Sequence, residues 1–243
     1  MSKTKTATHD VLLDLYQRAG LQVTLSVARD LLKSDVRGKI RKSKIAEFKT
    51  EMNGELSEVV LEILIMDYCA MHARQTKDWF WYKSLILRDP GGSADFLTEL
   101  DFTLFTPECI YIFECKSYSG KKRLSGDGML ERQSGNSCNV YKQNLLHVRT
   151  LDKNLKHSVK KPIYRMVMFN FSSGDLVDTR ADHAKFVMPC VGAEDWESVL
   201  VKGAPVWNLG AIKPFTDKLA KDSERLRERH LKYVKSIERY EDG

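Results

Sequence analysis

Residues 99–116 read ELDFTLFTPECIYIFECK and can be interpreted almost completely from turn chemistry and alternation. In the centre, Thr106-Pro-Glu-Cys109 carries proline at the second position of a four-residue turn, where its fixed φ suits type I or type II geometry. The residues on both sides are rich in aromatic and β-branched types that favour strands. We therefore predict a tight β-hairpin with strands at about 98–105 and 109–117.

The turn also predicts which residues of the two strands face each other. If Pro107 and Glu108 form the loop, the numbers of antiparallel partners add up to 215. Because side chains alternate between faces, this register gives an apolar face and a second face that carries charge. The apolar pairs are Leu104 with Tyr111, Phe102 with Phe113 and Leu100 with Cys115, and the charged pairs are Asp101 with Glu114 and Glu99 with Lys116. A slip of one residue would bury the charges, which favours this register.

The facing carboxylates of Asp101 and Glu114 suggest a metal site. Facing residues have Cβ atoms roughly 4.5–5.5 Å apart, so two carboxylates repel unless they share a cation or a proton. Mg²⁺ prefers oxygen ligands with few carboxylates, and the Cys115 carbonyl is a further candidate ligand. Lys116 points the same way as Glu114 and is a candidate for activating water or neutralising a transition state in phosphodiester hydrolysis. The alternative is an ordinary amphipathic hairpin with Glu99 and Lys116 paired in solvent.

Composition places the chain among soluble globular proteins. It has 243 residues, of which 42% are hydrophobic and 30% charged, enough for one large domain or two small ones. It lacks an apolar run of about 18 residues and an N-terminal signal segment, so we expect no membrane association and a cytoplasmic location.

The positive charge is concentrated near the N-terminus. Residues 1–50 hold 11 Lys and Arg against 5 Asp and Glu, a net +6 that equals the charge of the whole chain. Such a cluster suits contact with a nucleic-acid backbone, although a solvated linker or helix face is the alternative. The candidate phosphate contacts are Arg37, Lys39, Arg41, Lys42 and Lys44, together with Lys121, Lys122 and Arg123.

The remaining pattern predicts an α+β fold with a mixed sheet. Helices are expected at about 9–19, 25–33, 52–73, 139–157 and 213–240, and further strands at about 79–88, 163–171 and 184–190. The polar, glycine-rich segment 118–138 is expected to be a long mobile loop. The last helix has a thin apolar stripe that we expect to dock on the domain or on a partner helix, so an oligomer is possible through it.

The element order and several motifs resemble the PD-(D/E)xK nuclease superfamily and, more closely, its nuclease-related domain (NERD) family. The resemblance spans about residues 50–190 and includes Gly54-Glu55, Glu99-Leu-Asp101, Phe113-Glu-Cys-Lys-Ser-Tyr-Ser-Gly120, and Tyr141-Lys-Gln-Asn144 with His147. It implies a restriction-endonuclease-like αβββαβ core, an α/β sandwich, with Glu55 reaching the metal region and Gln143 positioning water or DNA. The chain departs from the pattern in lacking a proline before Asp101 and a tryptophan after Gly120.

Together these observations give one leading hypothesis. The chain is expected to be a DNA endonuclease or nickase that uses Mg²⁺ or Mn²⁺, with RNA not excluded as substrate. Asp101, Glu114, Lys116, Glu55 and Gln143 are its candidate catalytic residues. The alternative is a nucleic-acid-binding module that keeps the fold without activity. We expect a basic helical segment at 1–50, the nuclease domain at 51–205 and a C-terminal helix at 206–243.

Overall fold

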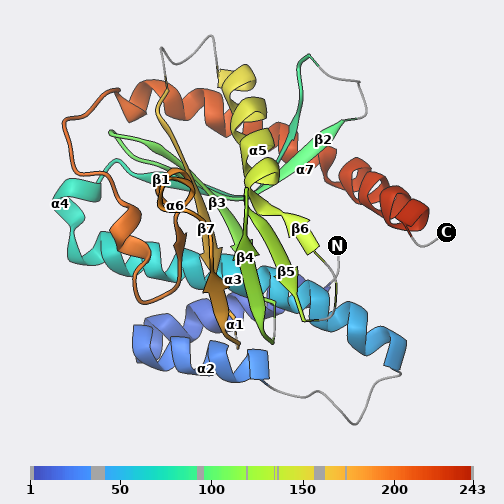
Figure 1. The fold of residues 1–243 in the computed structure, drawn as a ribbon. Helices are drawn as coiled ribbons and strands as arrows, with labels where there is room; N and C mark the ends of the chain where they lie inside the picture. Colours follow the sequence, from blue (N-terminus) through green and yellow to red (C-terminus); the bar gives the residue numbers. More distant parts are fainter. Residues whose placement is uncertain are drawn as a thin grey trace. The chain divides into compact units, whose positions relative to one another are not determined.

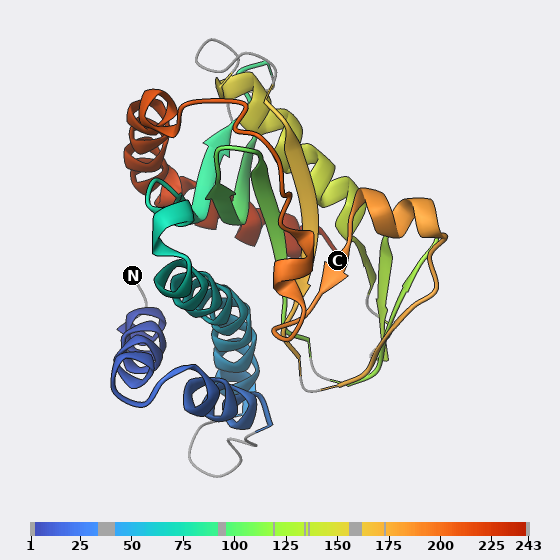
Figure 2. The same cartoon turned by 90° about the vertical axis from the view of Figure 1, so that its left-hand side faces the viewer.

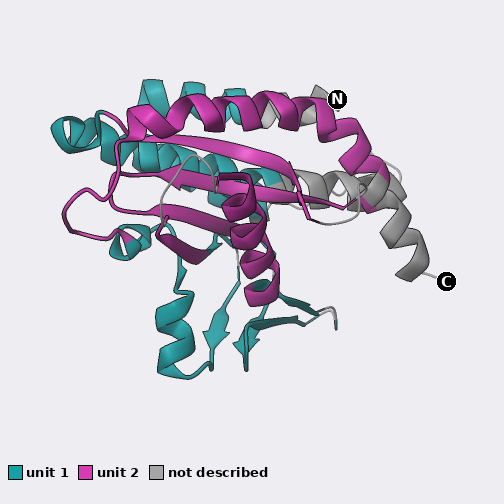
Figure 3. Cartoon of the chain, turned by 90° about the horizontal axis from the view of Figure 1, so that it is seen from above, with its two compact units in different colours: residues 1–77, 115–140, 168–199 teal, residues 78–114, 141–167, 200–243 magenta. Residues whose placement is uncertain are grey.

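The computed structural model of the protein describes residues 3–33, 42–91, 96–118, 120–133, 135, 137–155, 162–172 and 174–241. The chain forms two compact units, each assembled from three segments (Figure 3). Unit 1 contains Met1–Lys77, Cys115–Val140 and Met168–Val199, and unit 2 contains Asp78–Glu114, Tyr141–Val167 and Leu200–Gly243. The expected domain boundaries at residues 50 and 205 stay a prediction.

Three helices build the N-terminal part of unit 1, and Figure 2 shows them packed together. They are α1 (Lys3–Ala19), α2 (Leu21–Lys33) and α3 (Lys42–Met71). Gly20 separates α1 from α2 with a φ of 81°, a left-handed conformation that glycine adopts without steric cost. Its amide donates to Tyr16 O and so ends α1. Both predicted N-terminal helices are therefore confirmed, although each begins earlier than expected.

Helix α3 contains the long apolar segment that the sequence predicts. Between Leu56 and Ile65 its apolar residues are at most 3% exposed, and they occupy more than one side of the helix. Towards α1, His9 Nε2 lies 2.9 Å from Glu62 Oε2. The short helix α4 (Ala73–Thr76) follows it.

Five strands form the larger sheet, in the order β1-β2-β3-β7-β9. Their bounds are Phe80–Arg88 for β1, Leu97–Phe105 for β2, Ile110–Lys116 for β3, Tyr164–Asn170 for β7 and Cys190–Val191 for β9. The first three are antiparallel neighbours, and β7 pairs with β9 in parallel. Ile110 N donates to Ile163 O and Phe171 N donates to Lys116 O, so β3 and β7 run in the same direction. The sheet is mixed, as predicted.

The hairpin of β2 and β3 has the predicted register. Phe102 faces Phe113 and the pairing continues to the turn without a slip. Thr106 closes the turn, because its amide donates to Cys109 O at 3.0 Å and its Oγ1 accepts the Cys109 N–H at 3.2 Å. All seven residues of β3 are buried, so this strand is covered on both faces.

The core of unit 2 lies where the sheet packs against α5 (Val140–Leu155) and α7 (Leu209–Glu241), both labelled in Figure 1. Its buried members include Leu87, Phe105, Ile110 and Ile112 from the strands, Leu151 and Leu155 from α5, and Leu209 and Ile212 from α7. The C-terminal helix therefore docks on its own unit, one of the two alternatives that its apolar stripe suggests.

Strand β1 changes the direction of its side chains in the middle. Phe80 and Tyr82 pack in this core before Ser84, whereas Leu85 and Leu87 do so after it. Ser84 has a φ of 48°, a left-handed conformation that costs a residue with a Cβ about 1–2 kcal/mol. The kink thus moves the apolar face of β1 by one residue without changing its register with β2.

Strand β2 also changes the direction of its side chains next to Asp101. This change corrects one detail of the predicted hairpin. We placed Leu100 on the face of Phe102, but it packs in the core with Phe105 and Ile110. The strict alternation assumed for β2 therefore holds from Phe102 to the turn and not for Leu100. No local sequence signal marks this shift.

The polar segment 118–138 forms part of a second sheet, so its assignment to a long loop was wrong. The four strands, in the order β6-β5-β4-β8, are β4 (Lys122–Ser125), β5 (Met129–Arg132), β6 (Ser137–Asn139) and β8 (Leu176–Asp178). Gly126 and Gly128 have positive φ in the turn between β4 and β5, and Leu124 and Leu130 are fully buried on those strands. The glycines mark a tight turn between strands that are too short to show periodicity.

The strand predicted at 184–190 is wrong as well. Asp182–Val187 form the helix α6, and only Cys190–Val191 pair as β9. An acidic residue in the first turn favours the helix, and Pro189 lies just beyond its end. Phe186, whose apolar side chain suggested a strand, is 75% exposed. A 3₁₀ turn, Trp196–Val199 (η1), follows β9.

The described residues form a mixed α+β structure with two sheets, which confirms the predicted class. The chain order is helix α3, strands β1 to β3, helix α5 and strand β7, with β4 to β6 inserted after β3. Within the described ranges, no helix is long and apolar enough to cross a membrane.

Candidate functional site

Asp101 and Glu114 lie beside the last aromatic pair of the hairpin. Phe102 and Phe113 face each other, with ring centroids 6.2 Å apart in an edge-on arrangement. Asp101 and Glu114 are the next residues along the two strands, and their direct facing stays a prediction. The turn and the apolar pairs therefore hold the two acidic positions on neighbouring strands.

The kink of β1 occurs at the level of Asp101. Lys83 faces Phe102 and Leu85 faces Leu100, so Ser84 lies between two paired positions that bracket Asp101 on β2. Backbone strain of this kind is frequent at functional sites, where surrounding packing holds it in place. Sequence reasoning missed Ser84, because a single serine in an apolar strand carries no turn signal.

Glu114 is completely buried in unit 2 beside a histidine of α5. His147 Nδ1 lies 3.3 Å from Glu114 Oε2, within ion-pair distance although long for a hydrogen bond, and the histidine is only 2% exposed. A buried carboxylate needs a compensating partner, and His147 provides one. His147 belongs to the motif that carries the family resemblance. Its place one turn after Gln143, on the helix following the hairpin, was the available signal.

Asn144 fixes α5 against the sheet next to this pair. Its fully buried side-chain amide donates to Ile112 O at 3.3 Å and to Val167 O at 3.2 Å, which joins the helix to β3 and β7. Gln143, the neighbouring candidate, is half-buried on the same helix. Asn144 thus acts on the structure of the region, whereas Gln143 keeps access to solvent.

Strand β3 passes into unit 1 after Glu114, and Cys115 and Lys116 are its last residues. Lys116 is 8% exposed, and its ammonium lies 5.9 Å from the centroid of the Tyr118 ring. The guanidinium of Arg132 lies 4.2 Å from the same centroid, so the ring attracts two cations. Glu55, also in unit 1, is half-buried on α3.

Lys122 has a structural environment that differs from the phosphate contact we predicted. It is 3% exposed, and its ammonium donates to Tyr118 O at 2.6 Å, to Gly120 O at 3.0 Å and to Ser172 Oγ at 2.9 Å. Burial lowers the pKa of Lys122. This ammonium joins the segment after β3 to the segment after β7, so Lys122 is not available to a phosphate.

The other predicted phosphate contacts lie in two parts of the chain, around Lys122 and near the N-terminus. Lys121 and Arg123 are exposed on either side of Lys122. Arg37, Lys39 and Arg41 lie outside the described residues, whereas Lys42 and Lys44 belong to the first turn of α3.

The donor set limits which metals fit this region. Among the described residues, no group of three or more His, Cys, Asp and Glu side chains is placed to hold a metal ion. Two carboxylates, a backbone carbonyl and water remain compatible with Mg²⁺, which keeps several waters.

Comparison with known proteins adds a family to this geometry. Residues 59–170, nearly half of the chain, match the sequence model of the nuclease-related domain, NERD. The matched range covers the end of α3, the hairpin, α5 and β7 and includes every candidate catalytic residue except Glu55. No curated protein and no solved structure matches the chain. The resemblance inferred from the motifs is thereby confirmed.

Proposed function

Because residues 59–170 carry a nuclease-related domain, we propose that this protein is a divalent-metal-dependent DNA endonuclease or nickase that hydrolyses phosphodiester bonds. The observation that supports it best is the hairpin register, which pairs Phe102 with Phe113 and leaves Asp101 and Glu114 as the next residues of the two strands within the matched range. Cys115 and Lys116 follow directly on the same strand. The order Asp101, Glu114 and Lys116 follows the acidic and lysine positions of the PD-(D/E)xK pattern without its proline, and the proposal includes a restriction-endonuclease-like core.

In this proposal Asp101, Glu114 and the carbonyl of Cys115 hold Mg²⁺ or Mn²⁺. The bound ion would supply charge stabilisation and a lower pKa for water. Glu114 lies within ion-pair distance of His147, and Asp101 is half-buried. The few protein ligands agree with the preference of Mg²⁺ for retained waters.

Lys116 acts on the attacking water or on the negative charge of the transition state. Its side chain lies two residues beyond Glu114, on the same side of the strand. The carbonyl of Lys116 accepts the amide of Phe171, so its backbone is fixed by the residue that follows β7. Such fixed placement is what electrostatic stabilisation of developing charge requires. Glu55 and Gln143 would support the metal region and the water or DNA.

The substrate is held through basic residues at several places. Lys121 and Arg123 are exposed and suit contact with phosphates. The basic N-terminal residues Arg37, Lys39, Arg41, Lys42 and Lys44 remain in the proposal as further contacts.

One observation favours a second candidate function. The lack of a three-ligand group among the described residues also suits a nucleic-acid-binding module without metal chemistry. Such a module would bind DNA in a salt-sensitive manner and leave it intact with every divalent metal.

The test uses supercoiled plasmid with Mg²⁺ or Mn²⁺, which separates intact, nicked and linear products. Asp101→Asn and Lys116→Met are expected to lower the rate of cleavage at least about 100-fold, because each removes a group that acts on the transition state. Asp182→Asn and Lys202→Met, at exposed positions, are the matched controls and should cut like the original protein. Unchanged cleavage by the first two variants would refute the assignment, and intact plasmid with the original protein would favour the binding module.

A further inference from the structure

Three polar side chains fix the rotation of helix α7 about its own axis. They lie seven residues apart, so they recur on the same side of the helix. All three are buried and contact the strands of unit 2. The contacts join Thr216 Oγ1 to Tyr82 Oη at 3.0 Å, Ser223 Oγ to Ile86 N at 2.8 Å, and His230 Nε2 to Glu99 Oε2 at 3.1 Å. The opposite side of α7 therefore faces solvent in a defined orientation.

This outward side carries a stripe of basic residues, here called the α7 stripe. At about 100° per residue, its five members lie within an arc of roughly 80° and extend over about 21 Å. All five are exposed. The α7 stripe consists of Lys218, Lys221, Arg225, Arg229 and Lys232.

Acidic residues border the α7 stripe, among them Asp222 and Glu228. Asp222 lies at its margin and forms an ion pair with Arg225 at 3.5 Å. Arg225 is 82% exposed in this pair, and ion pairs in solvent of this kind contribute little. The guanidinium can therefore exchange its carboxylate for a phosphate.

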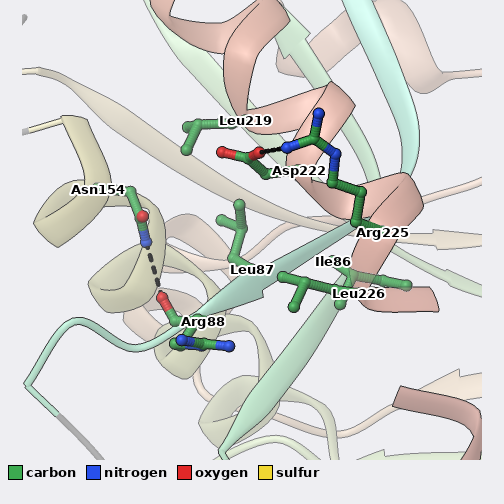
Figure 4. A pocket seen from close by; sticks show the side chains of 8 residues that line it. All are labelled: Ile86, Leu87, Arg88, Asn154, Leu219, Asp222, Arg225 and Leu226. Atoms are coloured by element: carbon green, nitrogen blue, oxygen red, sulfur yellow. Dashed lines mark hydrogen bonds and ion pairs between the residues drawn. The ribbon is translucent and has the colours of Figure 1, made fainter. Parts of the chain in front are cut away.

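A hollow of about 340 Å³ lies beside the stripe, between α7, β1 and α5. Figure 4 shows Arg225 of α7 and Arg88 of β1 on different sides of Leu87, which lines the hollow. Asn154 of α5 donates to Arg88 O at 3.0 Å and fixes the end of β1 there. The hollow thus extends the basic surface from the helix to the edge of the sheet.

We infer that the α7 stripe and Arg88 form a docking surface for the phosphate backbone of double-stranded DNA. Over about 21 Å a duplex presents roughly a dozen phosphate charges, which matches an extended row of cations better than a compact anion would. The inference rests on the proposed function only in taking DNA as the ligand. It places a DNA contact on unit 2, apart from the basic N-terminal segment.

A lipid surface fits this side of the helix less well. A helix that lies in a membrane interface presents an apolar face to the lipid. Leu209, Ile212, Leu219 and Ala220 of α7 instead pack in the core of unit 2. Phe215, Leu231 and Val234 are exposed but lie outside the arc of the α7 stripe, which contains charged residues.

The experiment measures binding of a fluorescent DNA duplex to the full chain at several salt concentrations, with a chelator present so that no cleavage occurs. The stripe variant carries Lys218→Gln, Lys221→Gln and Lys232→Gln. The control carries Lys77→Gln and Lys202→Gln at exposed positions and Lys185→Gln at a half-buried one, which remove the same charge elsewhere. We expect the stripe variant to bind at least about tenfold more weakly near 0.1 M salt, with a salt slope shallower by about 2–3. The control should change less than about twofold.

Equal losses in both variants would show an effect of net charge alone and would overturn the inference. So would unchanged binding by the stripe variant, or a loss of binding to anionic phosphatidylserine vesicles without a loss for DNA. Circular dichroism and thermal unfolding verify that both variants are folded. Cleavage of plasmid in Mg²⁺ is measured separately. DNA binding through the stripe without cleavage would refute the proposed function and keep the docking surface. Cleavage together with DNA binding that does not depend on the stripe would keep the proposed function and refute the docking surface.

Discussion

Unit 2 contains two carboxylate–histidine pairs that look alike in chemistry and differ in burial. Glu114 of β3 lies against His147 of α5, and Glu99 of β2 lies against His230 of α7, with N···O distances of 3.3 and 3.1 Å. The first pair is nearly inaccessible, whereas Glu99 retains 28% of its side-chain exposure. A carboxylate and an imidazole therefore suit an interior site at Glu114 and His147, and the attachment of a helix at Glu99 and His230.

The physical difference lies in how water compensates the charge. A carboxylate that keeps solvent contact loses little when its partner is removed, because water replaces the lost interaction. A fully buried carboxylate depends on its partner or on a bound cation. We therefore associate Glu114 with the reaction and Glu99 with the attachment of α7.

The largest expected difference concerns the two carboxylates. Glu114→Gln should lower plasmid cleavage at least about 100-fold, because an amide of the same shape is a poor ligand for Mg²⁺. Its free energy of unfolding should fall, because the substitution leaves His147 buried without its ionic partner. The matched variant Glu99→Gln should cut within about threefold of the original rate. Similar losses of activity in both variants would remove the distinction.

The two histidines should show a smaller difference of the same kind. His147→Ala removes the group that orients Glu114, which typically costs 10–100-fold in activity or metal affinity for groups that orient ligands. It should also lower the free energy of unfolding by about 3–5 kcal/mol, because a buried carboxylate remains uncompensated. His230→Ala should cost about 1 kcal/mol and leave the rate nearly unchanged. Urea unfolding and plasmid cleavage measure both quantities, and an equal cost for the two variants would contradict the role of burial.

The pair of Asp178 and Arg180 in unit 1 provides a third, milder case, in which the cation keeps its charge at every accessible pH. Arg180 is buried and donates to both carboxylate oxygens, at 3.0 and 2.7 Å. Burial by itself would raise the pKa of Asp178, but the hydrogen bonds from Arg180 outweigh it and hold the pKa below its usual range.

A carboxyl group with a lowered pKa stabilises the folded state above about pH 4, its pKa in the unfolded chain, and loses this contribution as the pH falls through the folded value. Stability measured by urea unfolding should thus decrease in acid, and part of this decrease should be missing in Asp178→Asn. If the variant and the original protein have parallel pH profiles, Asp178 does not contribute in the way we describe.

The sequence was sufficient to predict an element of the fold where a local signal fixes its geometry. Pro107 sets the turn, and the alternation of Phe102 and Phe113 with charged neighbours allows a single register, which the structure confirms. The long helices could be predicted for the same reason, since their apolar residues recur over several turns. The candidate acidic positions followed directly from the hairpin.

The rest depends on contacts between distant segments. The small sheet has strands of three or four residues, and Lys122 is buried because it meets Ser172 of another segment. A run of basic residues in sequence therefore did not correspond to a basic surface at Lys122. The kink at Ser84 is likewise held by packing on both sides, which no local pattern reveals.

Strand β1 is the outermost strand of its sheet and is rich in aromatic and aliphatic residues, features that invite pairing with another copy of the chain. The left-handed residue in its middle bends the strand away from the straight form that an added strand would need. The amide of Ile86 is already taken by Ser223. Helix α7, which carries the outward-facing cations, thus also covers part of the sheet edge at β1. In this way it hinders the addition of another strand and protects the protein against aggregation.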